Sequence, residues 1–383
     1  MKIAQCIFQI SKVGGIATVA RELKGGLEDN GHECVNYFVS SNKQVLPDPP
    51  SFCDKTIGYM TEKLFQDAID TLKGTDLFVF NPPCPTLTKA YTSRKWQSFF
   101  TDFSQPKLIV PHDPYLMSHY KWLLEVKEHI DGVACVQKKA YDPMKEHFFK
   151  IEIINHPMNL QNIGFYDDEK EDLVICPHQF KTWKHIDKFI SAVPQITYGS
   201  EIYNGGIEYH YMSGTKRKEK YKNSEGEWIW DKAIAHGMKY LGFVDDITSA
   251  YKRAKCVIDL SVGELGSRLS KVSKYRSLNY VPLEAMMYGA IPVVREYSLL
   301  SDIITKDNVV LVDESDLVNS TAKKVNEVIE NYESFTDMIS RNHDLLRKFY
   351  DRKENAKKLL DIFNKKEKTK EEQDYEDMMS EFS

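Results

Sequence analysis

The stretch Val281-Pro-Leu-Glu-Ala-Met-Met-Tyr-Gly-Ala-Ile-Pro-Val-Val294 is the most informative part of the sequence. The residues Val281–Gly289 predict a helix that ends at the glycine, and the apolar run Ile291–Arg295 predicts a buried strand directly after it. Glu284 stands on the apolar side of that helix. A buried carboxylate is costly unless hydroxyl or N–H groups bond to it, and ribose hydroxyls are suitable partners. The alternative is an exposed helix glutamate.

Outward from this stretch, short apolar runs alternate with amphipathic segments along the chain. This alternation predicts βαβ units, and therefore parallel sheets with right-handed crossovers. The pattern begins again after the polar stretch Gly164–Asp172, which predicts two doubly wound domains. The predicted strands are Ile3–Ile10, Glu33–Ser40, Leu77–Phe80, Lys107–Pro111, Gly132–Val136, Leu173–Pro177, Glu208–Ser213, Met238–Val244, Cys256–Leu260, Ile291–Arg295 and Val309–Val312. The predicted helices are Ile16–Asn30, Lys184–Val193, Ile247–Ala254, Val281–Gly289 and the charged segment Ser320–Phe363.

The length of 383 residues also favours two domains over one, because a single core rarely grows to that size. Hydrophobic residues at 42% and charged residues at 28% are typical of a folded globular chain. We predict a first α/β domain over residues 1–168 and a second over residues 169–345. Residues 346–383 are predicted to form a helix that returns to the first domain, followed by a charged tail.

The composition also bears on the compartment and the partners. No apolar run approaches the roughly 20 residues that span a bilayer, and Gln5 and Gln9 interrupt the apolar N-terminal stretch that imitates a signal peptide. Seven scattered cysteines without CxxC pairs fit neither a zinc site nor a disulfide framework. These features predict a cytoplasmic protein. The net charge of −5 gives no general attraction to nucleic acid, although a local basic surface stays compatible with it.

Two segments at predicted strand ends could bind an anionic ligand. Lys12-Val-Gly-Gly-Ile-Ala-Thr18 lies between the first strand and the first helix, where Gly14 and Gly15 allow close backbone approach and a helix N-terminus offers N–H groups. A tight turn is the alternative. His178-Gln-Phe-Lys-Thr-Trp-Lys184 follows the first strand of the second domain, and its lysines could neutralise a diphosphate. Solvated lysines with a packing tryptophan are the alternative there.

Two further segments could contact an acceptor. Pro111-His112-Asp113 follows a strand of the first domain, and such a pair could touch a sugar or move a proton. A structural histidine is the alternative. The segment Thr215-Lys-Arg-Lys-Glu-Lys-Tyr-Lys222, with Trp228 and Trp230 nearby, mixes basic and aromatic residues that could follow a phosphate backbone and stack on bases. A solvated loop is the alternative for this segment.

The arrangement of these motifs resembles the retaining GT-B glycosyltransferases over nearly the whole chain. Three parts of the chain are similar to segments of that family: the opening Gly14-Gly15 turn, the run Tyr240-Leu-Gly-Phe-Val-Asp-Asp246 with Tyr251 and Cys256–Leu260 after it, and Glu284 with the residues that follow it. The family carries two glutamates eight positions apart, and the second binds the donor ribose. Glu284 fits the second place, whereas Arg276 occupies the first. The resemblance implies two Rossmann-like domains facing across a cleft, with a UDP-sugar held by the second domain.

Shorter stretches resemble the 5-hydroxymethylcytosine DNA glycosyltransferases of T-even bacteriophages. They are Leu269-Ser-Lys271, Arg276-Ser-Leu-Asn-Tyr280 with Glu284, Thr182-Trp-Lys184 and His112-Asp113. The resemblance implies that Lys184, with Lys181 or Gln179, binds the UDP diphosphate. The expected catalytic residues are His112 and Asp113. The expected donor-binding residues are Gly14, Gly15, Gln179, Lys181, Lys184, Ser270, Arg276, Asn279, Tyr280 and Glu284. The expected DNA-binding residues are Lys216, Arg217, Lys218, Lys220 and Lys222.

The expected reaction moves glucose or arabinose from a UDP-sugar to 5-hydroxymethylcytosine in double-stranded DNA, with retention implied by the resemblance. No Asp-x-Asp motif is present, so we expect no metal ion and no cofactor besides the UDP-sugar substrate. We expect a monomer without membrane contact. Two alternatives stay open. One is a bacterial glycosyltransferase that builds surface polysaccharide, and the other is a non-catalytic module of the same fold that binds nucleotide or DNA.

Overall fold

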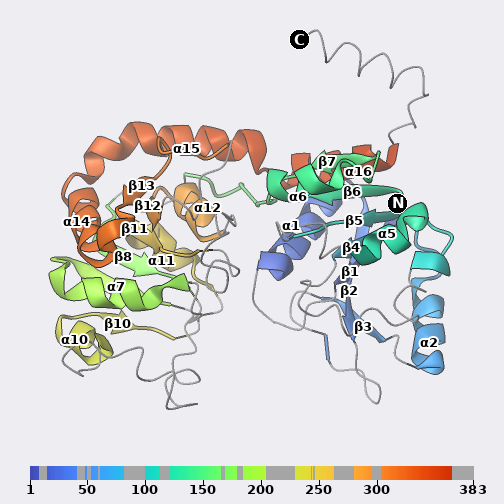
Figure 1. Ribbon diagram of the computed structural model, residues 1–383, viewed down its shortest axis with the longest axis horizontal. Coiled ribbons are helices and arrows are strands. Elements are labelled where there is room, and N and C mark those ends of the chain that lie inside the picture. The colour runs from blue at the N-terminus through green and yellow to red at the C-terminus, as the bar shows by residue number, and fades with distance from the viewer. Residues whose placement is uncertain are drawn as a thin grey trace, which may run out of the picture. The chain divides into compact units, whose positions relative to one another are not determined.

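The computed structural model describes residues 1–7, 15–40, 48–49, 53–58, 61–81, 100–112, 121–164, 169–178, 184–203, 229–242, 244, 246–262, 280–295 and 303–364. Contacts divide the chain into two compact units (Figure 1). Unit 1 comprises Met1–Asn159 together with the chain from Tyr350 onward, and unit 2 comprises Leu160–Phe349. The boundaries near residues 168 and 345 stay predictions of the sequence.

Unit 1 is built on a parallel sheet. Its described strands are β1 (Lys2–Ile7), β2 (Glu33–Ser40), β3 (Lys55–Gly58), β4 (Leu77–Asn81), β5 (Lys107–Ile109), β6 (Gly132–Cys135) and β7 (Ile151–Ile153), in the spatial order β3-β2-β1-β4-β5-β6-β7. Its described helices are α1 (Gly15–Asp29), α2 (Glu62–Leu72), α5 (Lys121–Glu125), α6 (Lys138–Met144) and α16 (Arg352–Asn364), with a 3₁₀ turn at Lys127–His129. The central strands are buried because helices cover a parallel sheet on its faces.

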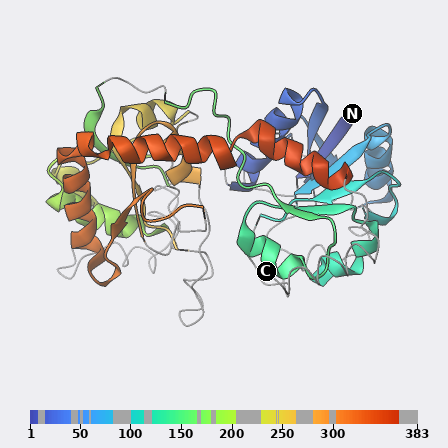
Figure 2. The ribbon, with the colours of Figure 1, turned by 90° about the horizontal axis from the view of Figure 1, so that it is seen from above.

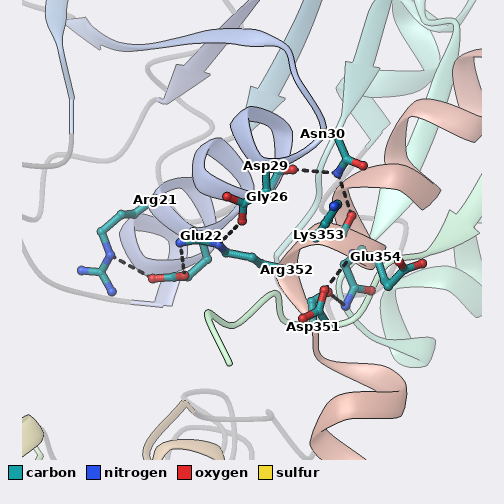
Figure 3. A network of polar contacts seen from close by, with 10 residues as sticks. Arg21, Glu22, Gly26, Asp29, Asn30, Asp351, Arg352, Lys353 and Glu354 are labelled. Carbon is teal, nitrogen blue, oxygen red and sulfur yellow. Dashed lines mark hydrogen bonds and ion pairs between the residues drawn. The ribbon is translucent and has the colours of Figure 1, made fainter. Parts of the chain in front are cut away.

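The last helix of the described chain packs in unit 1 beside the first. Figures 1 and 2 show α16, in red, against α1 and the β6–β7 edge of the sheet. Asn30 donates from Nδ2 to the carbonyl oxygens of Gly26 and Lys353, and Arg352 forms an ion pair with Asp29 at 2.7 Å (Figure 3). A Cβ on Gly26 would collide with the backbone of Arg352, so only glycine allows this close helix contact.

Unit 2 holds a second parallel sheet. Its described strands are β8 (Glu171–Cys176), β9 (Gly199–Ile202), β10 (Lys239–Tyr240), β11 (Ala254–Asp259), β12 (Ile291–Arg295) and β13 (Val310–Val312), in the order β10-β9-β8-β11-β12-β13. Its described helices are α7 (Ile186–Ala192), α10 (Ile229–Ala235), α11 (Thr248–Arg253), α12 (Tyr280–Met287), α14 (Leu317–Glu330) and α15 (Thr336–Phe349), with 3₁₀ turns at Val193–Gln195, Glu314–Asp316 and Tyr332–Phe335.

The main core of unit 2 lies between the sheet and the helices α7 and α14. Alternate strand residues such as Val174, Ile258 and Val293 pack there against Phe189 and Val325. This alternation follows from the two-residue period of a strand. Helices α11 and α12 contact β11, and α12 also packs against α15. The positions of β8, β11 and α12 matter most for function, because they hold the polar residues described below.

The α/β class predicted from the sequence is confirmed, with two parallel sheets of doubly wound type. The sequence did not predict β3, β7 or β9, and the strand predicted at Glu208–Ser213 lies outside the described residues. The helical segment predicted over Ser320–Phe363 is divided into α14, α15 and α16. None of the helices in the described ranges has the length and apolar character needed to cross a bilayer.

Six cysteines lie within the described ranges, and each is buried with a free thiol. Burial raises the pKa of Cys34 and Cys53 to about 12, so these thiols stay protonated and unreactive near neutral pH. These two behave as small apolar residues of the core.

Candidate active site

A buried histidine–aspartate pair lies at the carboxyl end of the unit 2 sheet. His178 follows β8 by two residues, and its Nε2 lies 3.0 Å from Oδ1 of Asp259, the last residue of β11. Asp259 also accepts a hydrogen bond of 2.9 Å from the backbone N–H of Ser261. The side chains of His178 and Asp259 are 3% and 1% exposed. Ligands of open α/β sheets bind at this end of the strands, so the pair stands in a favoured position.

The charges in this pair follow from its surroundings. Burial lowers the pKa of His178, and the nearby Asp259 only partly offsets that effect. Burial alone would raise the pKa of Asp259, but His178, Lys184 and Ser261 together hold it well below its usual range. At neutral pH the pair is therefore an aspartate anion beside a neutral imidazole, with Nε2 of His178 and Oδ1 of Asp259 in close polar contact.

Lys184 supplies a positive charge beside this pair. Its charge lowers the pKa of both His178 and Asp259, which indicates that the ammonium group lies in their neighbourhood. The next residue, His185, has a left-handed backbone with φ of 49° and precedes α7. Such a conformation is uncommon outside glycine and marks a sharp turn at the strand end. The turn brings one cation to the strand end that already carries the Asp259 anion.

Glu284 lies on α12 and contacts α11. It is partly buried, so it is not the exposed helix glutamate of the alternative reading. Its Oε2 accepts a hydrogen bond of 2.8 Å from the hydroxyl of Tyr251. Burial is the first cause that raises the pKa of Tyr251 well above its ordinary value, and the carboxylates of Glu284 and Asp259 add to it. The influence of Asp259 on Tyr251 indicates that the two polar groups of unit 2 are neighbours.

Two other predicted donor-binding residues lie at helix starts. Tyr280 begins α12 and stands four residues before Glu284, so both project from one face of that helix. Gly15 is the first residue of α1 in unit 1. The structure thus brings Lys184 near Asp259 and places Tyr280 and Glu284 on one helix face. It describes Gly15 only as the beginning of a helix, as the sequence predicted.

The predicted catalytic residue His112 belongs to a buried polar cluster of unit 1. It follows β5, and its Nε2 lies 2.9 Å from Oδ1 of Asn81, the last residue of β4. Gln137 donates to the backbone carbonyl of His112 at 3.2 Å. Because an amide oxygen only accepts, the Nε2 of His112 carries the hydrogen and Nδ1 carries the lone pair. This Nδ1 is buried and makes no hydrogen bond with the described part of the chain.

The histidines of this cluster are neutral at physiological pH. Burial, with a smaller effect of His156, lowers the pKa of His112 to about 3. Burial also lowers the pKa of His156 to about 4. A base this weak is a poor proton acceptor in an ordinary proton transfer, but its lone pair still accepts a hydrogen bond. The cluster is therefore suited to contact a hydroxyl group without charge.

The other predicted site residues lie outside the described residues, and their roles stay predictions. These are Gly14, Asp113, Gln179, Lys181, Ser270, Arg276, Asn279, Lys216, Arg217, Lys218, Lys220 and Lys222. Within the described ranges, no group of three or more His, Cys, Asp or Glu side chains is arranged to hold a metal ion.

Four residues of these two clusters were not among the predicted site residues: Asp259, Tyr251, Asn81 and His156. Asp259 and Asn81 could have been found from the pattern that identified Glu284, since each is a polar residue next to an apolar strand run. Tyr251 was marked only by the family resemblance of its segment, without a role. His156 gave no such signal, because a histidine in a half-apolar segment is ordinary. Their polar contacts become visible only in the folded chain.

Comparison with known proteins assigns a family to most of unit 2. Residues 164–344 match the family model described as glycosyl transferases group 1. This range includes His178, Lys184, Asp259 and Glu284. Among curated proteins, no sequence matches the chain significantly.

Solved structures with the same fold cover nearly the whole chain. The structure of Anabaena Alr3699/HepE in complex with UDP has a TM-score of 0.68 and 12% identity, and the match covers 95% of this chain and 100% of that one. An alpha-glucosyltransferase in complex with UDP and a 13-mer DNA containing a HMU base has a TM-score of 0.67 and 15% identity, with the same two coverages. At such identities the likeness shows the fold.

These comparisons confirm the GT-B fold that the sequence resemblance implied, over both units. They also support the prediction that the chain is a UDP-sugar-dependent enzyme. Residues 164–344 form a glycosyl transferases group 1 domain, and the chain is a glycosyltransferase with the GT-B fold.

Proposed function

We propose that this glycosyltransferase moves glucose or arabinose from a UDP-sugar to the hydroxyl of 5-hydroxymethylcytosine in DNA. The observation that carries the donor half of the proposal is the charged strand-end site of unit 2, which falls inside the group 1 domain. The likeness to an alpha-glucosyltransferase solved with UDP and DNA supports the acceptor half, together with the sequence resemblance around Arg276 and Lys184.

Unit 2 would hold the nucleotide. Glu284 would accept hydrogen bonds from the ribose hydroxyls, and Lys184, with Lys181 and Arg276, would stand at the diphosphate. Gln179, Ser270, Asn279 and Tyr280 would complete the donor site of unit 2. The donor role of Gly14 and Gly15 stays a prediction of the sequence. The structures of HepE and of the alpha-glucosyltransferase each contain UDP, which supports a uridine donor here.

The reaction breaks the bond between the anomeric carbon of the sugar and the diphosphate oxygen, and forms a bond from that carbon to the acceptor oxygen. The departing diphosphate takes the bonding electrons, and it also receives the proton that the acceptor hydroxyl loses. Lys184 would stabilise the negative charge that develops on the leaving group, and such fixed charges are usually the largest electrostatic contribution to catalysis. Retention of configuration stays part of the proposal.

Unit 1 would receive the acceptor. The lone pair on Nδ1 of His112 would accept a hydrogen bond from the hydroxymethyl group, and Asp113 would stand beside it. A cytosine inside a duplex hides that group, so the base would be flipped out at a cost of a few kcal/mol. Phosphate contacts from Lys216, Arg217, Lys218, Lys220 and Lys222 would offset this cost.

A surface polysaccharide is the second candidate acceptor. HepE, whose structures contain UDP and glucose, has a TM-score as high as that of the alpha-glucosyltransferase solved with DNA. The fold alone therefore does not separate the two acceptors. The DNA acceptor is preferred because the sequence stretches near Lys184 and Arg276 resemble the DNA-modifying family.

The test compares two duplexes of one sequence, with cytosine or with 5-hydroxymethylcytosine, each incubated with UDP-glucose and with UDP-arabinose. The DNA is then digested to nucleosides, and their masses are measured by mass spectrometry. We expect a hexose or pentose mass added only to 5-hydroxymethylcytosine. The Glu284→Ala variant is the control for donor dependence. If neither duplex gains a sugar while a glycan acceptor does, the polysaccharide candidate replaces the proposal.

A further inference from the structure

Tyr251 is held in place at both ends. Lys170 donates from Nζ to the backbone carbonyls of Tyr251, Lys252 and Ala254, at 3.1, 2.9 and 2.9 Å. These three bonds use all the hydrogens of the ammonium group and cap the C-terminal end of α11. The backbone that carries Tyr251 is thus anchored where α11 passes into β11.

The ring of Tyr251 is anchored as well. It is 1% exposed and stacks on Tyr288, with ring centroids 6.2 Å apart and an angle of 19° between the planes. Its hydroxyl reaches Oε2 of Glu284 at 2.8 Å. A carboxylate oxygen can only accept, so the phenol is the donor, and its high pKa keeps it protonated.

We propose that Tyr251 is a positioning residue that fixes the carboxylate of Glu284 for the ribose hydroxyls of the nucleotide. The proposal rests on the ribose role of Glu284 under the proposed function and adds a residue outside the group that would touch the ligand. A glutamate side chain has several rotamers, and a buried donor that holds one carboxylate oxygen selects among them before the ligand arrives. The other oxygen then keeps a defined direction.

The test uses a pair of matched variants. Tyr251→Phe removes the hydroxyl that holds Glu284 and keeps the ring. Tyr332→Phe removes another buried tyrosine hydroxyl of unit 2, which donates to the carbonyl of Gly289 at 2.6 Å. Both variants lose one hydrogen bond of similar kind, so a general loss of stability should affect both. Only the first changes the surroundings of Glu284.

Titration calorimetry of the full chain would use two ligands, UDP and 2′,3′-dideoxy-UDP. We expect Tyr251→Phe to weaken UDP binding about five- to tenfold, as expected for one lost hydrogen bond to a charged or polar group. Tyr332→Phe should stay within about twofold of the wild type. With dideoxy-UDP the two variants and the wild type should bind alike, because the hydroxyls that Glu284 would bind are gone.

Steady-state kinetics give a second readout. The ribose is remote from the bond that breaks, so Tyr251→Phe should raise KM for the UDP-sugar and leave kcat within about twofold. A merely structural tyrosine would lower binding of both nucleotides together, and that result would overturn the proposal. An unchanged UDP affinity in Tyr251→Phe would also overturn it. If Glu284→Ala binds UDP as the wild type does, the ribose role itself fails, which is a separate outcome.

Discussion

The strand-end clusters of the two units are built from similar residues, but the cluster of unit 2 is charged and the cluster of unit 1 is neutral. In unit 2, His178 faces an ionised Asp259 and a nearby Lys184. In unit 1, His112 faces the uncharged amide of Asn81, and His156 is also neutral. One cluster therefore offers fixed charges, and the other offers neutral donors and acceptors.

This difference matches the two substrates that the proposed reaction requires. A diphosphate carries charge that increases as the bond to the sugar breaks, so a cation held near it lowers the barrier. A hydroxyl acceptor is neutral, and a neutral imidazole can accept its hydrogen bond without a strong field. The predictions below test whether the charged and the uncharged cluster behave differently.

The largest expected effect is the acid sensitivity of the uncharged cluster. The pKa of His112 is lowered to about 3 and that of His156 to about 4, below the ordinary value of roughly 6.5. The unfolded chain takes up protons at these histidines as the pH falls below about 6.5, whereas the folded chain does not until the pH approaches 4. The free energy of unfolding therefore keeps its full value above pH 6.5. Between pH 6.5 and the folded-state pKa it falls by about 1.4 kcal/mol per pH unit for each histidine.

Urea unfolding of the wild type, His156→Gln and the exposed-site control His129→Gln between pH 7 and pH 4.5 would measure this loss. His156→Gln should reduce the slope of unfolding free energy against pH by about 1.4 kcal/mol per unit, because glutamine takes up no proton. His129→Gln should keep the wild-type slope. Equal slopes for all three proteins would show that burial does not keep His156 neutral.

Removal of the charge in unit 2 should cost stability even at neutral pH. Asp259→Ala removes the anion beside the buried His178 and leaves the Ser261 N–H without its acceptor inside the core, and we expect a loss of about 3 kcal/mol in unfolding free energy. Asp172→Ala is the matched control, because Asp172 pairs with Lys255 at the surface and should cost less than 1 kcal/mol. Urea unfolding at pH 7 compares them. A loss in Asp259→Ala as small as that of the control would contradict the buried ion.

Lys184 should matter more for turnover than for nucleoside binding. We expect Lys184→Ala to lower kcat/KM for the UDP-sugar about a hundredfold, since one fixed charge at the leaving group is lost. Uridine has no phosphate, so its affinity should stay within about twofold. Lys239→Ala, an exposed lysine of the same unit, is the control for general charge. If uridine binding falls as far as turnover does, Lys184 has a structural role instead.

The smallest expected effect is the ribose contact. Glu284→Ala should weaken UDP binding by about 1.5–3 kcal/mol, or roughly ten- to 150-fold, which is the range for hydrogen bonds to a charged group. Glu327→Ala removes an exposed glutamate of α14 and should leave the affinity unchanged. Titration calorimetry with UDP measures both. Equal affinities in the two variants would remove Glu284 from the donor site.

The sequence predicted the fold class because the strands of both sheets are apolar runs separated by amphipathic helices. It missed β9 for a physical reason. Gly199, Ser200 and Glu201 are poor strand formers, and β9 forms because it pairs with β8 while Arg253 neutralises the buried Glu201. The very short β7 likewise has no local signal that separates it from a turn.

The candidate site could be predicted in part. Glu284 and His112 were identified because each interrupts or follows an apolar run. The contact from Tyr251 to Glu284 joins residues 33 positions apart, and that from Asn81 to His112 joins residues 31 apart. Such pairs depend on how strands and helices are ordered in space, which local sequence patterns do not contain.

The central claim is that unit 2 holds the nucleotide through its charged strand-end cluster. Hydrogen exchange of the full protein, with and without saturating UDP, tests it most directly because no variant is needed. The claim predicts slower amide exchange in α7, α12 and the end of β8, with little change in β4 and β5 of unit 1. Protection confined to unit 1, or no protection anywhere at saturating UDP, would contradict it.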